Sequence, residues 1–153
     1  QEVLSARIPF FHGLFNANMT ECANGVVDLS SAFSDTGFSS LENLLQYAYT
    51  GCLAISELNV QDLMMGASFL SMDSILDECA EFMRRRMTID NVFPLLFFCR
   101  DIGYKKIHNS ILNFIDKNFV SISRTSGFRN LSVDDLVVVL QRDSLYVDKE
   151  DQV

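Results

Sequence analysis

Apolar residues recur at intervals of three and four along most of this chain, which is the spacing of one face of an α-helix. The clearest stripe lies between Ser40 and Gly51 and consists of Leu41, Leu44, Leu45 and Ala48. Gly51 favours a helix end, because a residue without a side chain adopts left-handed backbone at little cost. The pattern predicts a helix over 40–51, followed by a short extended piece over 52–55.

The beginning of the chain is predicted to be less regular. Apolar positions over 3–19 are close to helical spacing, but Pro9 interrupts them and Gly13 lowers the helix propensity. We therefore expect one broken helix or two short ones. Adjacent β-branched residues over 26–29 favour a short strand, and the Ser, Asp and Gly residues over 30–40 favour a loop.

Two more amphipathic helices are predicted before residue 87, with Asn59 and Asp73 as their N-terminal caps. The buried stripe of the second helix is expected to contain Ile75, Leu76, Cys79, Phe82 and Met83. This helix closes with three arginines over 84–86, where cations complement the negative end of the helix dipole. A nucleic-acid patch is the alternative interpretation, but it needs more basic residues than these three.

The rest of the chain is predicted to be helical, as a second unit over 88–153. Asp90 or Asn91 is expected to cap its first helix, Pro94 lies where a first turn tolerates proline, and Gly103 marks the end. The next helix shows apolar positions at Ile107, Ile111, Leu112, Ile115 and Phe119. A polar stretch over 121–130 follows, and the residues over 132–135 resemble a capping box that starts a last helix.

Composition and charge narrow the class of protein. The 153 residues are 48% apolar and 21% charged, which is typical of soluble globular proteins with room for one medium domain or two small ones. A net charge of −8 argues against nucleic acid or an anionic membrane as the main partner. The longest apolar run, over 93–99, is far shorter than the ~20 residues of a membrane span. The first residues show no secretory signal pattern.

No pattern of catalytic or metal-binding residues is visible. The four cysteines are spread singly, without the paired spacing of a zinc site or a redox dithiol. Unpaired cysteines indicate a reducing compartment, so we expect the protein in the cytosol or the nucleus. His12 and His108 are far apart, and no Gly-rich phosphate loop is present. We therefore predict no enzyme activity, no cofactor and no metal ion.

Several motifs together resemble a known family. Tyr47 to Gly51 is similar to the Tyr-Thr-Gly segment of BTB (POZ) domains, and Met19-Thr20-Glu21 upstream is similar to their hydrophobic-x-Glu motif. The residues over 3–11 partly match a helix of the same domain, although Arg7 and Ile8 replace small residues near the family's homodimer seam. After Met87, the chain resembles the BACK domain of kelch-like proteins.

This resemblance implies a mainly α protein. Residues 1–87 would be the C-terminal part of a BTB/POZ domain, an α+β portion with little strand, and residues 88–153 the N-terminal part of an all-α BACK helical bundle. The first BTB strands would lie upstream, and the rest of BACK and a kelch propeller downstream. Without them, we expect the chain alone to expose apolar surface and to aggregate or pack loosely.

The implied function is a non-catalytic interaction module, the substrate adaptor of a cullin-3 RING ubiquitin ligase. The residues expected to bind cullin-3 are Met19, Glu21, Tyr49, Val92, Phe93 and Leu96. Met19 offers a flexible apolar contact and Glu21 a partner for a basic group; the alternative is a helix end with a surface glutamate. Tyr49 is either a contact at the cullin-facing edge or a core residue with its hydroxyl at the rim.

The other three residues would border a groove of the BACK domain that takes the N-terminal extension of the cullin, unless they are simply interior residues. Further expected partners are a second copy of the protein, in a homodimer, and a protein substrate bound by a domain outside this chain. Two other functions stay open: a homodimerising scaffold or cytoskeleton-associated kelch-like protein without ligase binding, and a BTB transcriptional regulator with zinc fingers.

Overall fold

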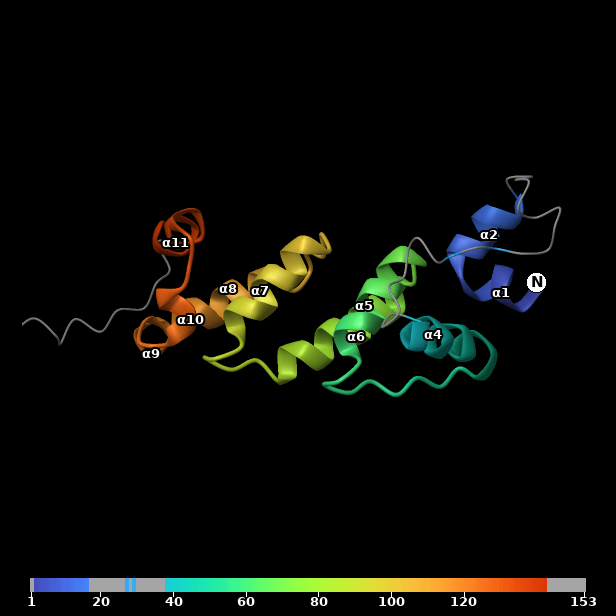
Figure 1. Ribbon diagram of the computed structural model, residues 1–153, viewed down its shortest axis with the longest axis horizontal. Coiled ribbons are helices and arrows are strands. Elements are labelled where there is room, and N and C mark those ends of the chain that lie inside the picture. The colour runs from blue at the N-terminus through green and yellow to red at the C-terminus, as the bar shows by residue number, and fades with distance from the viewer. Residues whose placement is uncertain (1, 17–26, 28, 30–37, 143–153) are drawn as a thin grey trace, which may run out of the picture. The chain divides into compact units, whose positions relative to one another are not determined.

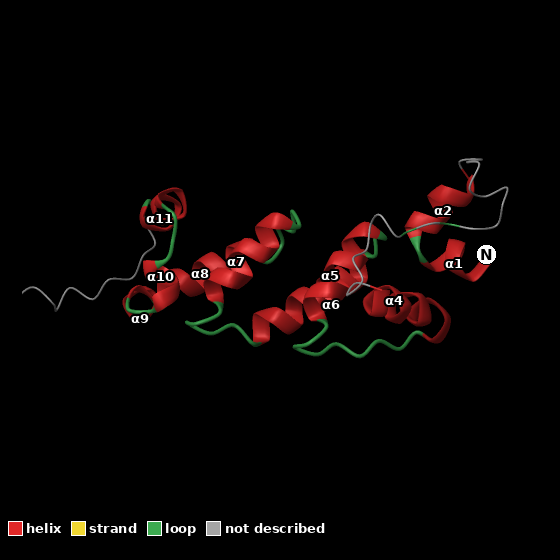
Figure 2. Ribbon diagram, in the orientation of Figure 1, coloured by secondary structure: helices red, strands yellow, loops and turns green. Residues whose placement is uncertain are grey.

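The computed structural model describes residues 2–16, 27, 29 and 38–142. Within these ranges the chain is helical and contains no strand (Figure 2). The prediction of a mainly α protein is therefore confirmed. Most of the loop expected over 30–40 and part of the strand expected over 26–29 lie outside the described residues, and Val27 and Leu29 are in no regular element. The chain divides into two compact units, Gln1–Phe82 and Met83–Val153.

The first unit is built from short helices (Figure 1), and its buried residues are mostly apolar. They are α1 (Glu2–Arg7), α2 (Pro9–Asn16), α4 (Phe38–Thr50), α5 (Val60–Phe69) and α6 (Asp73–Arg85), the last turn of which belongs to the second unit. Pro9 separates α1 from α2, so the expectation of two short helices is confirmed up to Asn16. Helix α1 packs against α2 and α4, and α4 packs against α5.

Helix α4 follows its predicted pattern closely. Leu44 and Ala48 are fully or almost fully buried, and Leu41 is 7% exposed. The helix ends where Gly51 adopts a φ of +73°, with its N–H bonded to the carbonyl of Tyr47 at 2.8 Å. Left-handed backbone of this kind favours glycine, so the sequence signal for the helix end is confirmed.

The starts of α5 and of α7 (Val92–Asp101) share one arrangement that differs from the predicted caps. Asn59 and Asn91 occupy the capping positions, but neither side chain bonds to its helix. Each amide oxygen accepts from an N–H three residues earlier, at 2.8 Å, and each amide nitrogen donates to a carbonyl five residues earlier, at 2.9 Å. These asparagines therefore fasten the preceding loop, because its backbone groups would otherwise lack partners.

Helix α6 also begins differently from the prediction. Asp73 is its first helical residue, and the carbonyl of Met72 before it accepts from the N–H groups of Ile75 and Leu76. The carboxylate of Asp73 thus belongs to the first turn, where a negative charge still favours the positive end of the helix dipole. Most of the expected stripe is buried, whereas Phe82 is half-buried.

The second unit contains five complete helices among its described residues (Figure 1). They are α7, α8 (His108–Lys117), α9 (Phe119–Ser123), α10 (Ser126–Arg129) and α11 (Val133–Leu140). The polar stretch over 121–130, for which the sequence predicted no element, contains part of α9 and all of α10. Phe93 explains this, because its ring lies 6.2 Å from that of Phe128, which in turn lies 5.7 Å from Phe119. Aromatic packing of distant residues holds these short turns in helical form.

Two ion pairs tie distant parts of the second unit together. Arg142 donates two hydrogen bonds to the buried carboxylate of Asp116 in α8, at 2.9 and 2.7 Å. Arg100 in α7 donates to Asp135 in α11, at 2.6 Å. The hydroxyl of Ser132 accepts from the N–H of Asp135 at 3.2 Å, which confirms the predicted cap of α11.

Candidate protein-interaction site

An open hollow with a volume of about 590 Å³ lies between the end of α4 and the loop after it. Its walls are Asn43, Gln46, Thr50, Cys52, Leu53, Ala54 and Asn59. The three residues from α4 are spaced by three and four positions, so they form one polar face beside the buried stripe of the same helix. This amide and hydroxyl surface can both donate and accept hydrogen bonds.

Two side chains shape the loop that closes this hollow. The hydroxyl of Thr50 donates to the carbonyl of Gln46 at 2.9 Å and accepts from the N–H of Cys52 at 3.2 Å. On the far side, the amide of Asn59 donates to the carbonyl of Ala54 at 2.9 Å. Because both ends of the loop are fastened by side chains, the hollow is largely preformed.

Tyr49, in the last turn of α4, is not among the residues that line this hollow, and it is 59% exposed. Its neighbour Tyr47 is half-buried, so the two tyrosines of the Tyr-Ala-Tyr segment point in different directions along α4. The alternative interpretation required Tyr49 to be a core residue. Its exposure does not fit that interpretation. Exposed tyrosine rings are enriched at protein-binding surfaces. Binding by Tyr49 stays a prediction.

The three site residues predicted in α7 lie in the core of the second unit. Val92, Phe93 and Leu96 are 0%, 2% and 7% exposed. Phe93 packs against the rings of Phe97 and Phe128, with centroids 6.4 and 6.2 Å away. Side chains this buried do not form the walls of an open groove, so the structure supports the interior interpretation of these residues. The cause is that α7 is apolar on nearly every face and needs cover all round.

Met19 and Glu21 lie outside the described residues, as does Cys22. Cys79 and Cys99 are buried, and burial raises the pKa of each thiol to about 11, with the charge of Glu78 adding to the effect at Cys79. Cys52 is exposed in the wall of the hollow. In the described parts of the chain, no three potential ligands gather around a metal position, and no helix is long and apolar enough to cross a membrane.

An exposed apolar surface on α5 was missed in the sequence. Leu58, just before the helix, is 96% exposed, and Met65 and Phe69 are 46% and 40% exposed. Phe69 also meets the ring of Phe10 in α2, with centroids 5.0 Å apart. The signal was present, since these residues recur at intervals of seven and four, but such spacing equally fits a buried stripe. Only the packing of the first unit shows that these side chains are partly exposed.

Comparison with known families identifies the class of protein. The model of the BTB/POZ domain matches residues 1–86, and the model named BTB And C-terminal Kelch (BACK) matches residues 92–153. The chain therefore belongs to the BTB/POZ family, with a BACK region after the BTB part. The resemblance drawn from the Tyr-Thr-Gly and Met-Thr-Glu segments is confirmed.

The curated relatives are kelch proteins. Kelch repeat and BTB domain-containing protein 8 of Danio rerio is 31% identical over the whole chain, and protein 6 of the same series in Homo sapiens is 30% identical over the whole chain. Kelch-like protein 40 of Xenopus tropicalis is 29% identical over 99% of the chain. The chain spans about a quarter of the length of these relatives, at 25%, 23% and 24%. Proteins of this class are generally adaptors for protein interactions.

Proposed function

We propose that this chain is part of a non-catalytic substrate adaptor that binds cullin-3 within a RING ubiquitin ligase. Membership of the BTB-BACK class supports the adaptor role, and the observation that carries the contact is the exposed ring of Tyr49 in the last turn of α4. The same proposal includes a homodimer, a location in the cytosol or nucleus, and a protein substrate held by a domain outside this chain. We place the boundary between the two domains near Met87.

The cullin-facing surface in this proposal is centred on the end of α4. Tyr49 supplies apolar area and a hydroxyl at its rim, and the amides of Asn43 and Gln46 supply hydrogen bonds. Met19 and Glu21 add an apolar contact and a negative charge. The net charge of −8 favours a basic patch on the partner, because complementary charge raises the rate of association.

Helix α7 has an indirect role in this proposal. Since Val92, Phe93 and Leu96 are buried, they act by holding α7 in place rather than by touching the cullin. Their replacement by alanine would loosen the second unit and weaken binding only as a consequence of lost stability. Variants of these residues therefore cannot serve as tests of a direct contact.

The test measures binding of the purified N-terminal domain of cullin-3 to the full-length protein by calorimetry. Met19→Ala, Glu21→Ala and Tyr49→Ala are compared with Met65→Ala and Glu78→Ala, which change exposed residues of the same types on α5 and α6. A loss of about 2 kcal/mol or more at one of the first three sites marks a binding hot spot. The two control variants are expected to bind as the unmodified protein does.

Two outcomes contradict this proposal in different ways. Tight binding that none of the first three substitutions changes would place the contact on another surface. No binding at all, together with self-association of the full-length protein, would favour the homodimerising scaffold. Zinc-finger spacings in the remainder of the protein would favour a transcriptional regulator instead.

A further inference from the structure

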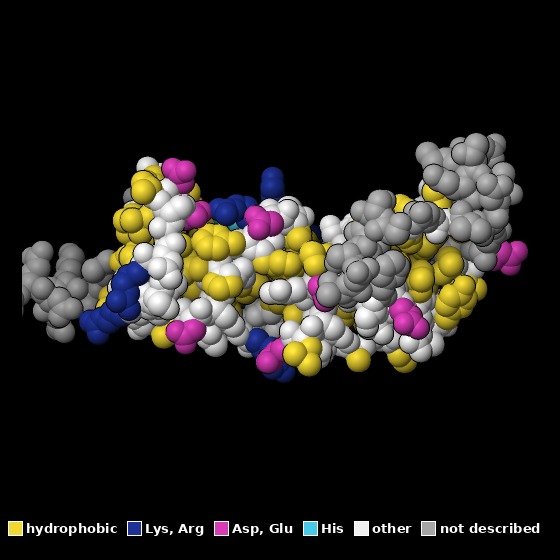
Figure 3. All heavy atoms as spheres, in the orientation of Figure 1, with side chains coloured by type: hydrophobic (Ala, Val, Ile, Leu, Met, Phe, Trp, Pro, Cys, Tyr) yellow, Lys and Arg dark blue, Asp and Glu magenta, His cyan; other side chains and the backbone are white. Residues whose placement is uncertain are grey.

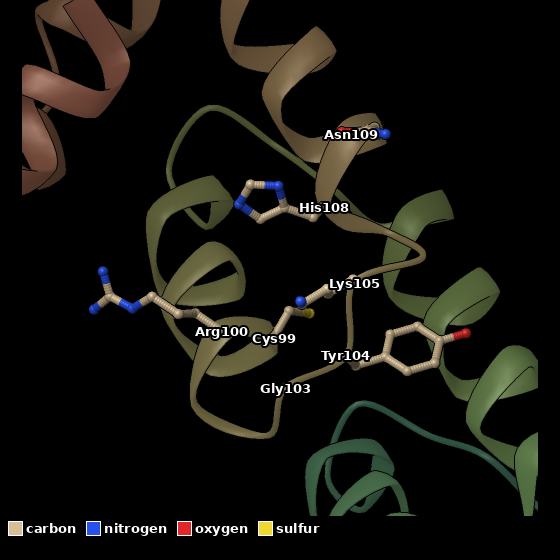
Figure 4. Close-up of a pocket in the computed structure, with 7 residues that line it drawn as sticks. All are labelled: Cys99, Arg100, Gly103, Tyr104, Lys105, His108 and Asn109. Atoms are coloured by element: carbon tan, nitrogen blue, oxygen red, sulfur yellow. The ribbon is translucent and has the colours of Figure 1, made fainter.

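A second cavity lies in the second unit, between the end of α7 and the start of α8. It has a volume of about 400 Å³, and the residues around it are Cys99, Arg100, Gly103, Tyr104, Lys105, His108 and Asn109 (Figure 4). Gly103 makes the turn possible with a φ of +71°. The N–H of Tyr104 bonds back to the carbonyl of Cys99 at 2.9 Å, so the turn that shapes the cavity is fastened to α7.

Basic side chains dominate the charge of this cavity. Arg100, Lys105 and His108 line it, and no carboxylate is among its described lining residues. Such a concentration is unexpected in a chain with a net charge of −8. Figure 4 shows the guanidinium of Arg100 and the ring of Tyr104 directed to opposite sides, with Lys105 and His108 between them.

The three basic groups differ in what already neutralises them. Arg100 is paired with Asp135 at 2.6 Å and lies 3.8 Å from Asp101, so its charge is largely balanced. No hydrogen bond or ion pair joins the side chains of Lys105 and His108 to any residue that the structure describes. The donors left open toward the cavity are therefore an ammonium and an imidazole.

The thiol of Cys99, which lines the cavity, adds no negative charge to it, whereas the carbonyl end of α7 adds a partial negative charge. Cys99 is 1% exposed and its thiol stays protonated, because burial disfavours the thiolate. Helix α8 begins with Ile107 at its capping position, and no side chain accepts a bond from the first turn. The first N–H groups of this helix add a partial positive charge on the same side as Lys105 and His108.

We propose that this cavity binds a phosphomonoester, with Lys105 and His108 as its main donors. A phosphomonoester carries a charge of about −1.5 to −2 and three acceptor oxygens, so it can satisfy several donors that approach from different directions. A single carboxylate has less charge and fewer acceptor positions. The volume of about 400 Å³ exceeds that of the phosphate group and leaves room for the residue or small molecule that carries it.

The test uses the full-length protein and three probes at fixed ionic strength. Calorimetry measures binding of inorganic phosphate, of O-phospho-L-serine, and of a phosphoserine pentapeptide with four alanines, beside the unphosphorylated pentapeptide. The variants are Lys105→Gln and His108→Gln. Lys117→Gln is the matched control, because Lys117 is an exposed lysine at the other end of α8. Melting curves establish that each variant is folded.

All phosphorylated probes are expected to bind, and the unphosphorylated peptide is not. Lys105→Gln should weaken binding at least tenfold, which is the size expected for loss of a charge-assisted hydrogen bond, while Lys117→Gln should leave it unchanged. Tighter binding of the phosphopeptide than of phosphoserine would identify a phosphorylated protein segment as the source of the group, and equal binding would identify a small phosphate compound. Absence of binding at millimolar concentration, or equal loss in Lys105→Gln and Lys117→Gln, would overturn the proposal.

Discussion

Replacing Arg142 by alanine is expected to loosen the contact between the end of α11 and α8. Arg142 makes two hydrogen bonds to Asp116, and these bonds raise the pKa of the guanidinium. The side chain of Asp116, which carries the carboxylate, is only 5% exposed. The substitution would leave this buried charge without the guanidinium that compensates for its lost hydration.

The size of the effect follows from burial of the two partners. Removing one member of a buried ion pair costs about 3–5 kcal/mol. The side chain of Arg142 is 26% exposed, so water can partly replace it, and we expect about 2–3 kcal/mol. At 1.4 kcal/mol per factor of ten, this corresponds to a roughly 30- to 150-fold increase in the opening equilibrium of α8 and α11.

Hydrogen exchange in the full-length protein measures this opening directly, because it reports local free energies without requiring global two-state unfolding. Peptides that cover α8 and α11 should exchange faster in Arg142→Ala by that factor. Arg142→Lys keeps the charge but loses the bidentate geometry. Its exchange rates should therefore lie between those of the unmodified protein and of Arg142→Ala. Arg129→Ala, which removes an exposed arginine from α10, is the control. A change below about threefold in Arg142→Ala would refute the reasoning.

Two further predictions concern protonation. Hydrogen bonds from Ser132 and Arg100 lower the pKa of Asp135, so its stabilisation of α11 is present above the ordinary carboxyl pKa of about 4 and is lost as pH falls through the lowered value. The rate of amide hydrogen exchange at the start of α11, corrected for intrinsic rates, should therefore rise more between pH 5 and pH 3 in the unmodified protein than in Asp135→Asn. The same rise in both proteins would contradict this. Iodoacetamide at pH 8 should label exposed Cys52 at least a hundredfold faster than Cys99, whose pKa burial raises to about 11; similar rates by peptide mass spectrometry would exclude a buried Cys99.

The exposed valines of α11 show how far sequence periodicity reaches. Val133, Val137 and Val138 are 77%, 43% and 55% exposed, although an apolar run after a capping serine predicted the helix itself correctly. Figure 3 shows hydrophobic side chains at the surface over this helix. An apolar run indicates that a helix has much surface to cover, but it does not tell which part the rest of the unit covers.

Local chemistry in the sequence determined the helical class, the break at Pro9, the end of α4 at Gly51 and the cap of α11 at Ser132. Each of these depends on residues within one or two helical turns, so their spacing is visible along the chain. The same is true of the Tyr-Thr-Gly segment, because a contiguous motif needs no knowledge of packing.

Tertiary packing decided which residues of the candidate site are accessible. It left Tyr49 exposed and buried Val92, Phe93 and Leu96, a distinction that the apolar pattern of α4 and α7 does not contain. It also joined Arg142 to Asp116, 26 residues away in the chain. Such contacts depend on how helices meet in space, and because helix periodicity specifies faces but not their partners, only the folded structure could supply them.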